Sequence, residues 1–431
     1  MKQQIFKKFK PGTVFNPLKG KYLVSKEYQL VKLKFPSRLN AMAIDPSKIT
    51  SNENMIFTPG EVVFSVKIYR NIVIRIEGKR NQISISDDSK RKSLIIHAVK
   101  LMQKALNVDD GLYISVDNKN ELRHSGLGSS GALIAGVASA VNELYGKPIS
   151  NGNLVVYLAQ NHGEEIETDN DHIQQVQCIG GSAASGNFND GLIIITGKSK
   201  IIATMKVPKE YKAVIGMPKD YTPLDAEKMM KLEEKNLDKF LVTGKRYGRE
   251  IAYRMLHEAI PAMVDQNLIP IGNLIFDYRF KMGSIKNCSF SYSKMISIAN
   301  KIAFLKNETD TPVLSLSSVG PAFFAITKDT NKISDIFKKN GMKSIIVEIE
   351  NSKYKVSRKT FWNDQKIVEY FADKPPDVRI KTRLEKIKKR SKIKALDLGC
   401  GGGRHTKLLL QLGFDVYACD TNPEMLKTTR N

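Results

Sequence analysis

Cysteines and long apolar runs are scarce in this sequence, and each shortage excludes a class of protein. The 431 residues contain only four cysteines, scattered without a Cys-x-x-Cys pair, so the sequence predicts neither a disulfide framework nor a zinc site. No apolar run approaches the ~18 residues that a membrane-spanning helix needs. No apolar segment follows the basic N-terminus either, so we expect a cytoplasmic protein with no membrane partner.

Acidic residues are outnumbered by basic ones. The chain has 68 Lys and Arg against 44 Asp and Glu, a formal net charge of +24. The basic residues are spread along the chain and form no stripe interleaved with aromatic residues, so we do not expect a nucleic-acid partner. The excess instead favours a small anionic substrate. A homodimer is left open.

Apolar periodicity predicts a mixed α+β chain. Over the first half it predicts strands at 27–35, 62–68, 71–76, 112–116, 191–196 and 201–207, and helices at 93–106, 132–144 and 153–167. The next stretch has a strand at 211–217, helices at 225–240, 250–264 and 291–305, and strands at 313–316, 322–327 and 344–350. Helices enclosed by strands in this way are typical of an α+β domain.

A glycine-rich loop precedes the helix expected at 132–144. It reads His-Ser-Gly-Leu-Gly-Ser-Ser-Gly over 124–131. Glycines let a backbone approach a phosphate, serine hydroxyls bind it, and a helix N-terminus favours its negative charge. An ordinary turn that opens a helix is the alternative. We predict phosphate binding by Ser125, Gly126, Gly128, Ser129, Ser130 and Gly131.

Three segments of this chain resemble the motifs of the GHMP superfamily, which includes galactokinase, homoserine kinase and mevalonate kinase. Pro36–Asn40 is similar to the first motif and Gly126–Ala132 to the second, whereas Ser317–Pro321 stands at the third without its glycine run. The resemblance covers about 27–350. It implies a ribosomal protein S5 domain 2-like domain at 27–205 and a ferredoxin-like domain at 206–350.

One branch of the superfamily, the beta-ribofuranosylaminobenzene 5′-phosphate synthases, shows a similar third motif. Its Ser-Ser-Trp-Gly-Pro turn resembles the segment that contains Ser317, Ser318 and Gly320, and Pro36–Asp45, Ile260–Val264 and Gly181–Ile194 are similar to other segments of that branch. The resemblance implies transfer from phosphoribosyl pyrophosphate to a hydroxy- or aminobenzoate, with release of pyrophosphate and CO2, in methanopterin biosynthesis. Two departures are Cys178-Ile179 where an arginine usually stands, and Asn40, which matches the kinases.

Two alternatives stay open beside the synthase. An ATP-dependent small-molecule kinase would need a magnesium carboxylate and an aspartate near the acceptor hydroxyl. For Mg²⁺ the candidates are Ser130, Glu164 and Glu167, and for catalysis Asp171, Arg38 and Asn40. The acidic cluster at 164–171 is equally compatible with a solvated helix end. A non-catalytic module that binds a phosphorylated metabolite is the third alternative.

The C-terminal part has a different pattern. After a basic linker and lead-in helix at 351–392, a strand, a glycine turn, a helix and a second strand follow within 393–431. The segment Asp397–Arg404 resembles the first motif of class I S-adenosylmethionine-dependent methyltransferases. The resemblance implies that Asp397, Gly399, Gly401 and Gly403 contact the methionine part of the cofactor and Asp420 its ribose. We expect an incomplete Rossmann-like domain that binds S-adenosylmethionine poorly or not at all.

Overall fold

The chain folds as two compact units. The structure, a computed structural model, describes residues 7–49, 59–118, 125–166, 169–224, 226–307, 310–361 and 365–430. The larger unit comprises Met1–Val24 and Lys32–Ser357, and the smaller one comprises Ser25–Val31 and Arg358–Asn431. Among the described residues, none of the helices combines the length and apolar character that crossing a bilayer requires.

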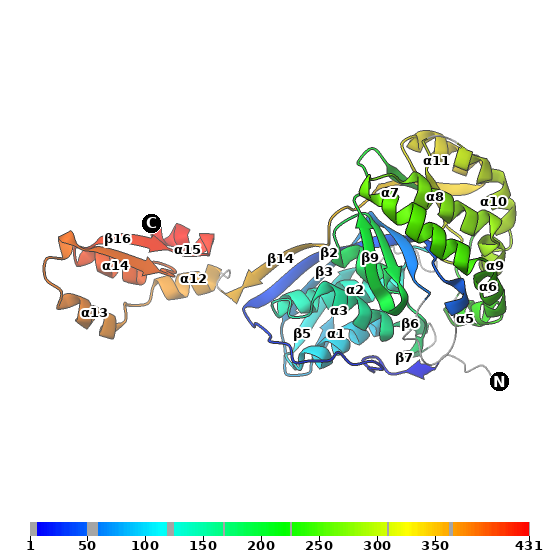
Figure 1. The fold of residues 1–431 in the computed structure, drawn as a ribbon. Coiled ribbons are helices and arrows are strands. Elements are labelled where there is room, and N and C mark those ends of the chain that lie inside the picture. The colour runs from blue at the N-terminus through cyan, green and yellow to red at the C-terminus, as the bar shows by residue number, and fades with distance from the viewer. Residues whose placement is uncertain are drawn as a thin grey trace. The chain divides into compact units, whose positions relative to one another are not determined.

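A mixed sheet forms the first layer of the larger unit (Figure 1). Within the described residues its strand order is β14-β2-β3-β5-β4, with β8 paired to β3 and β9 paired to β8. The strands are β2 (Tyr28–Ala43), β3 (Glu61–Ile76), β4 (Ile83–Ile85), β5 (Leu112–Asp117), β8 (Leu192–Thr196), β9 (Lys200–Met205) and β14 (Lys355–Thr360).

The strand β3 continues through Tyr69-Arg70, where the sequence analysis placed a break. The side chain of Arg70 is buried, and its guanidinium donates a hydrogen bond to Ser37 Oγ at 3.0 Å. Ser37 belongs to the neighbouring strand β2. A polar pair inside a sheet resembles a turn when only the local sequence is considered, which is why one long strand was predicted as two.

Helices α1 to α4 cover one face of this sheet (Figure 1). Their bounds are α1 (Lys92–Leu106), α2 (Ser129–Leu144), α3 (Asn151–Gln160) and α4 (Gly181–Asn187). The helix α2 lies very close to the sheet, because a Cβ atom on Gly136 would come within 2.5 Å of Ile72 Cδ1 on β3. This packing buries almost the whole of α2 and holds its N-terminus in place.

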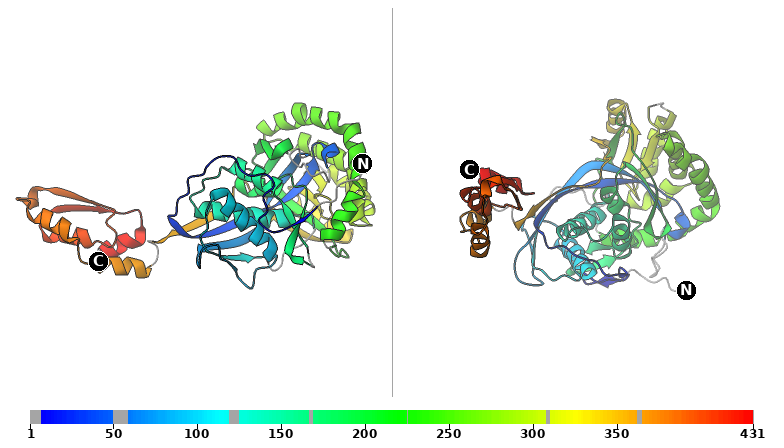
Figure 2. Two further views of the ribbon diagram at one scale, coloured as in Figure 1. Left: turned by 90° about the horizontal axis from the view of Figure 1, so that it is seen from below. Right: turned by 60° about the vertical axis from the view of Figure 1, so that its left-hand side comes forward.

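A second, antiparallel sheet follows along the chain. In the described part of the chain its order is β11-β12-β10-β13, with strands β10 (Lys212–Pro218), β11 (Val313–Leu316), β12 (Phe323–Thr327) and β13 (Met342–Glu348). The helices of this part are α5 (Ala226–Glu234), α6 (Leu237–Arg254), α7 (Ile260–Val264), α8 (Ile269–Phe276), α9 (Ser284–Cys288), α10 (Met295–Ile302) and α11 (Thr330–Lys339). They gather beside the second sheet in all three ribbon views (Figures 1 and 2).

The helix expected at 250–264 is instead the end of α6, a π-helical turn at Met255–Ala259 and the short helix α7. The helices α8 and α11 were not predicted. In α8 the segment Ile269–Phe276 is almost wholly apolar, and apolar residues on all sides hide the helical period. A short apolar run of this kind does not distinguish a buried helix from a buried strand.

One hydrophobic core joins both sheets of the larger unit. The cluster contains Leu39, Phe64 and Ile194 from the first sheet together with Ile215 and Phe324 from the second. The rings of Phe64 and Phe324 meet edge to face with centroids 6.1 Å apart. The two halves expected from the sequence therefore share a core, and elements far apart in the sequence are held in fixed relative positions.

The smaller unit contains a two-stranded parallel sheet in its described residues. Strands β15 (Lys394–Leu398) and β16 (Asp415–Cys419) are connected by α14 (Arg404–Gln411), and they pair in register from Lys394 with Asp415 to Leu398 with Cys419. The other helices of this unit are α12 (Gln365–Ala372), α13 (Val378–Glu385) and α15 (Pro423–Arg430). The predicted strand, glycine turn, helix and strand are confirmed.

Candidate functional site

The glycine-rich loop leads directly into α2. Gly126 and Gly128 have φ of 85° and 68°, and the left-handed conformation of Gly128 begins the helix at Ser129. Ser129 and Ser130 therefore lie in the first helical turn, where backbone N–H groups lack partners within the helix. His124, which was included in the predicted loop, lies outside the described residues.

The three motif segments meet at this loop. Ser317 Oγ donates to Gly126 O at 2.7 Å and accepts from the Asn40 backbone N–H at 3.1 Å. Ser318 N–H donates to Asn40 O at 2.9 Å. Arg38 Nη1 also donates to Gly126 O, at 2.9 Å. Segments that are about 90 and 190 residues apart from the loop are thus joined to it by hydrogen bonds.

Arg38, one of the predicted catalytic residues, has a hydrogen-bond donor that is not used. Its Nε atom is buried and has no hydrogen-bond partner in the described structure. An unsatisfied buried donor is costly, and this one adjoins Gly128, because a Cβ atom there would come within 2.9 Å of it. The arrangement is suited to an anion that accepts a hydrogen bond at the start of α2.

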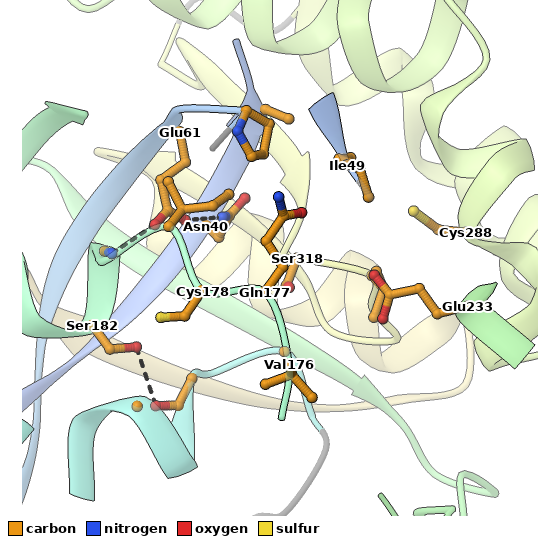
Figure 3. A pocket seen from close by; sticks show the side chains of 18 of the residues that line it. Asn40, Ile49, Glu61, Val176, Gln177, Cys178, Ser182, Glu233, Cys288 and Ser318 are labelled. Atoms are coloured by element: carbon orange, nitrogen blue, oxygen red, sulfur yellow. Dashed lines mark hydrogen bonds between the residues drawn. The ribbon is translucent and has the colours of Figure 1, made fainter. Parts of the chain in front are cut away.

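Asn40, also predicted, holds a carboxyl that the sequence analysis missed. Its side-chain amide donates to Glu61 Oε2, and the Gly181 N–H donates to Glu61 Oε1 at 2.6 Å, as dashed lines show in Figure 3. Burial raises the pKa of Glu61, although the charge of Arg38 and the two hydrogen bonds oppose this shift. An acidic residue at the start of the apolar run 61–68 was the only available signal.

A cavity of about 290 Å³ opens beside these groups. The loop, Arg38, Asn40 and Glu61 line one side, and helices α5 and α6 line the other, while the segment Val176–Ile179 also lines the cavity, with Cys178 beside Asn40 and Ser182 (Figure 3). The third-motif residues Ser318 and Gly320 also line it, whereas Ser317 lies behind them. Burial raises the pKa of the Cys178 thiol in the cavity wall to about 12, so this thiol stays neutral and is a poor nucleophile.

The acidic cluster was expected on and after a helix, but its described residues lie on a β-hairpin. Helix α3 ends at Gln160, and β6 (Gly163–Ile166) and β7 (Asp169–Gln175) form an antiparallel hairpin that continues onto β1 (Lys8–Phe9). Pairing with a strand from the N-terminus is a tertiary contact that local periodicity does not reveal. Asp171 is exposed on β7 and does not line the cavity. Glu167 lies outside the described residues.

Glu164 does reach the loop, together with a residue that the sequence analysis did not single out. Arg91, the residue before α1, donates from Nη1 to Ser129 Oγ at 3.2 Å and from Nη2 to Ser130 Oγ, and it forms ion pairs with Glu164 and Glu165. Burial raises the pKa of Glu164, but the hydrogen bond from His162 and the charges of His162 and Arg91 outweigh it and lower the pKa to about 2. Nothing in the local sequence around Arg91 indicates that its side chain reaches the glycine-rich loop.

In the smaller unit, the predicted residues gather at the carboxyl ends of the paired strands. The turn that contains Gly399, Gly401 and Gly403 follows β15, and Asp420 follows β16. The Gly401 N–H donates to Asp420 Oδ2 at 2.8 Å, and Thr406 Oγ1 donates to Asp397 Oδ2 at 2.6 Å. The carboxyl ends of parallel strands are where cofactors bind in such folds.

Comparison with protein families gives two matches. Residues 93–182 match the family described as GHMP kinases N terminal domain, and residues 396–431 match the one described as Methyltransferase domain. The first match contains the glycine-rich loop, α2 and the hairpin, and the second contains the glycine turn and Asp420. One segment of the chain is thus similar to GHMP kinase N-terminal domains and another to methyltransferase domains.

Among curated proteins, two homoserine kinases of Methanococcus maripaludis are similar to this chain. The one from strain C5 / ATCC BAA-1333 is 28% identical over 161 residues, and the one from strain DSM 14266 is 27% identical over the same length. Each match covers 37% of this chain and 48% of the relative, so the chain spans about half the length of the curated relatives it matches.

Solved structures show the same fold at low identity. Mevalonate diphosphate decarboxylase from Staphylococcus aureus has a TM-score of 0.53 at 13% identity and covers 76% of this chain and 98% of its own. Lactococcus lactis galactokinase complexed with galactose has a TM-score of 0.53 at 12% identity, with 76% and 95% covered. Homoserine kinase from Cytophaga hutchinsonii has a TM-score of 0.50 at 15% identity, with 79% and 100% covered. The α+β fold expected from the sequence is confirmed.

Proposed function

We propose that the larger unit is an ATP-dependent kinase of the GHMP type that phosphorylates the hydroxyl group of a small amino alcohol. The observation that carries the proposal is the meeting of three motif segments at the N-terminus of α2, on the wall of a cavity. The likeness of 161 residues to homoserine kinases supports the kinase over the phosphoribosyl-transferring synthase.

Phosphoryl transfer depends mainly on positioning and on stabilising charge. Here the first turn of α2, whose N–H groups have no partner within the helix, and Arg38, whose Nε donor is unused, both line the cavity. They would bind the phosphate groups of the nucleotide. The Asn40 N–H donates to Ser317 Oγ, and both Ser317 Oγ and Arg38 Nη1 donate to Gly126 O, which fixes the loop relative to Arg38. These groups would bind the nucleotide phosphates without reorganising during the reaction.

The other side of the cavity supports an acceptor with a positive charge. The Glu233 side chain from α5 points into the space beside Ser318 and Gln177 (Figure 3). It makes no hydrogen bond or ion pair within the described residues, and burial raises the pKa of its carboxyl group to about 7. An ammonium group would supply the missing partner, which favours an acceptor that carries an amino group and a hydroxyl over a neutral sugar or an acid without an amino group.

Release of ADP tests this proposal. We expect L-homoserine or another amino alcohol to support ADP release, and mevalonate and galactose to support little. Glu233→Gln should raise the acceptor KM at least tenfold and leave the KM for ATP unchanged. The matched control is Glu227→Gln on the same helix, because Glu227 pairs with exposed Lys231 and does not line the cavity.

The acceptor KM should also depend on pH. Because the Glu233 carboxyl has a pKa of about 7, its charged form increases as pH rises through that value, and the acceptor KM should fall. The Glu233→Gln variant should lose this dependence. ADP release with mevalonate or galactose alone, insensitive to Glu233, would contradict the proposed acceptor class.

The phosphoribosyl-transferring synthase is the second candidate. One specific observation favours it: the Ser317–Pro321 turn lies against the loop, and Ser318, Val319 and Gly320 line the cavity. This reaction would release pyrophosphate from phosphoribosyl pyrophosphate when a hydroxy- or aminobenzoate is present. Pyrophosphate release without any ADP formation from ATP would favour this candidate.

For the smaller unit we propose S-adenosylmethionine binding at the glycine turn. Support comes from the glycines after β15, the carboxylate of Asp420 after β16 and the match of residues 396–431 to a methyltransferase domain. Titration calorimetry with S-adenosylmethionine should detect binding that Asp420→Ala removes. Heat of binding that is the same in both proteins would contradict this site.

A further inference from the structure

Arg91 lies where the sequence predicts a protein-bound magnesium ion. The predicted ligands were Ser130, Glu164 and Glu167, of which the first two are described. The Arg91 guanidinium lies between these two groups, donating to Ser130 Oγ and pairing with Glu164 Oε2 at 3.4 Å. Glu165 Oε2 accepts from Arg91 Nε at 3.1 Å on the other edge of the guanidinium.

The backbone around Arg91 fixes this position. Arg91 is in the left-handed conformation, with φ 61°, and its carbonyl accepts from Leu94 N–H at 3.1 Å to begin α1. The preceding residue, Lys90, is held at both its N–H and its C=O by the side chain of Asn118, at 2.8 and 2.9 Å. The Arg91 side chain is only 2% exposed. The guanidinium is therefore a built part of the loop rather than a surface charge.

Ser130 and Glu164 do not fit a magnesium ion in this arrangement. Mg²⁺ requires near-octahedral oxygen ligands at about 2.0–2.1 Å. The Ser130 hydroxyl accepts from Arg91 and hydrogen-bonds to Glu164, so its proton and one of its two lone pairs are engaged within the protein, and the cation Arg91 occupies the acceptor side of the oxygen. A dication on this pair would also lie against the guanidinium. Among the described residues no group of three or more His, Cys, Asp or Glu side chains is arranged to hold a metal.

Ser129 differs from Ser130 in the direction of its hydroxyl proton. Its Oγ accepts from Arg91 at 3.2 Å, and a hydroxyl that accepts from a cation directs its own proton elsewhere. Ser129 lies in the first turn of α2 and lines the cavity. Its hydroxyl is therefore oriented to donate to a phosphate oxygen beside the free N–H groups of the helix.

We infer that Arg91 takes the place of a protein-held divalent cation at the phosphate loop and orients the Ser129 hydroxyl toward the nucleotide phosphates. The inference rests on the proposed function, because it presumes that ATP binds at α2. The consequence is that the described residues around the loop contribute no magnesium ligand, so metal-free nucleotide should bind nearly as well as the magnesium complex.

Two measurements test this inference. Calorimetry of ATP with excess Mg²⁺ and with EDTA should give dissociation constants within about threefold of each other. Electron paramagnetic resonance of free Mn²⁺ without nucleotide should detect no bound ion in the native protein. In Arg91→Ala the guanidinium no longer covers Ser130, Glu164 and Glu165, so these side chains should bind Mn²⁺. The affinity of this variant for ATP in EDTA should fall at least tenfold. Arg75→Ala, which removes an exposed arginine paired with Glu77, is the matched control.

The outcomes separate this inference from the proposed function. A loss of ATP affinity of tenfold or more in EDTA by the native protein would overturn the role of Arg91. Binding of Mn²⁺ by the native protein that Glu164→Gln abolishes would overturn it as well. If ATP binds under neither condition, the kinase proposal fails, and the Mn²⁺ measurement still decides whether Arg91 blocks a metal site. Should Arg91→Ala fail to fold, both measurements on the native protein remain decisive.

Discussion

Replacing Gly128 with alanine should lower both the free energy of unfolding and the affinity for ATP, and the two effects can be measured separately. Gly128 has φ 68°, and an added Cβ atom would lie 2.6 Å from Ser182 Oγ and 2.9 Å from Arg38 Nε. The left-handed conformation costs a non-glycine residue about 1–2 kcal/mol. Reduced freedom of the unfolded chain offsets about 0.4–1 kcal/mol, and displacing two side-chain ends adds a similar amount.

The free energy of unfolding should therefore fall by about 1–2 kcal/mol. For a unit of roughly 350 residues, unfolding entropy of about 2.1 cal/mol/K per residue makes the expected change in Tm about 1–3 °C. The effect on binding should be larger, because the Cβ atom pushes Arg38 Nε away from the anion. A hydrogen bond to a charged group contributes about 1.5–3 kcal/mol, which corresponds to a loss of affinity of about 10- to 100-fold.

Calorimetry of ATP binding and thermal unfolding should be measured on the same samples. Gly152→Ala is the control, because Gly152 lies in α3 with nothing within 4 Å of an added Cβ, and it should raise Tm slightly and leave the affinity for ATP unchanged. Adding Ser182→Ala to Gly128→Ala should restore part of the stability, since it removes the contact with Oγ, but should not restore binding. An unchanged ATP affinity in Gly128→Ala would refute the phosphate-loop assignment.

Three further predictions concern other parts of the chain. Asn40→Ala should lower the free energy of unfolding in urea by about 1–3 kcal/mol, because buried Glu61 loses a donor, and a change below about 0.5 kcal/mol would refute that contact. Burial lowers the pKa of His97 to about 4, so the neutral ring stabilises the fold above pH 6.5 and this contribution is lost as pH falls toward 4. Replacing His97 with glutamine should flatten the dependence of Tm on pH between 7 and 5, and an unaltered dependence would contradict the shift. Asp420→Ala should lower the Tm of the smaller unit, because the Gly401 N–H loses its acceptor, and an unchanged Tm would contradict that role.

Features with a local physical cause were predicted correctly from the sequence. The glycine-rich loop and α2 follow from glycines beside an apolar helical run, and the parallel strands β15 and β16 follow from two short apolar runs around a helix. The fold class also follows, because the order of helices and strands along the chain restricts the architectures available.

Features that depend on distant residues were missed or misassigned. The strand β6 was predicted as the end of the helix at 153–167, since the hairpin that it forms with β7 is fixed by pairing with β1, more than 150 positions away. Asp171 was assigned to catalysis from its place in an acidic cluster, and the hairpin leaves it exposed away from the cavity.

The sequence alone determined the glycine positions, the serines that follow them and the order of the elements, because each depends on residues adjacent in the chain. Only the tertiary structure decided which charged groups reach those serines. Arg91 and Glu61 carry no local signature, yet packing of α1 against α2 brings Arg91 to the loop, and packing of β3 against α4 brings Glu61 to the wall of the same cavity. Burial then requires each of these charges to have a partner, and the fold as a whole supplies it.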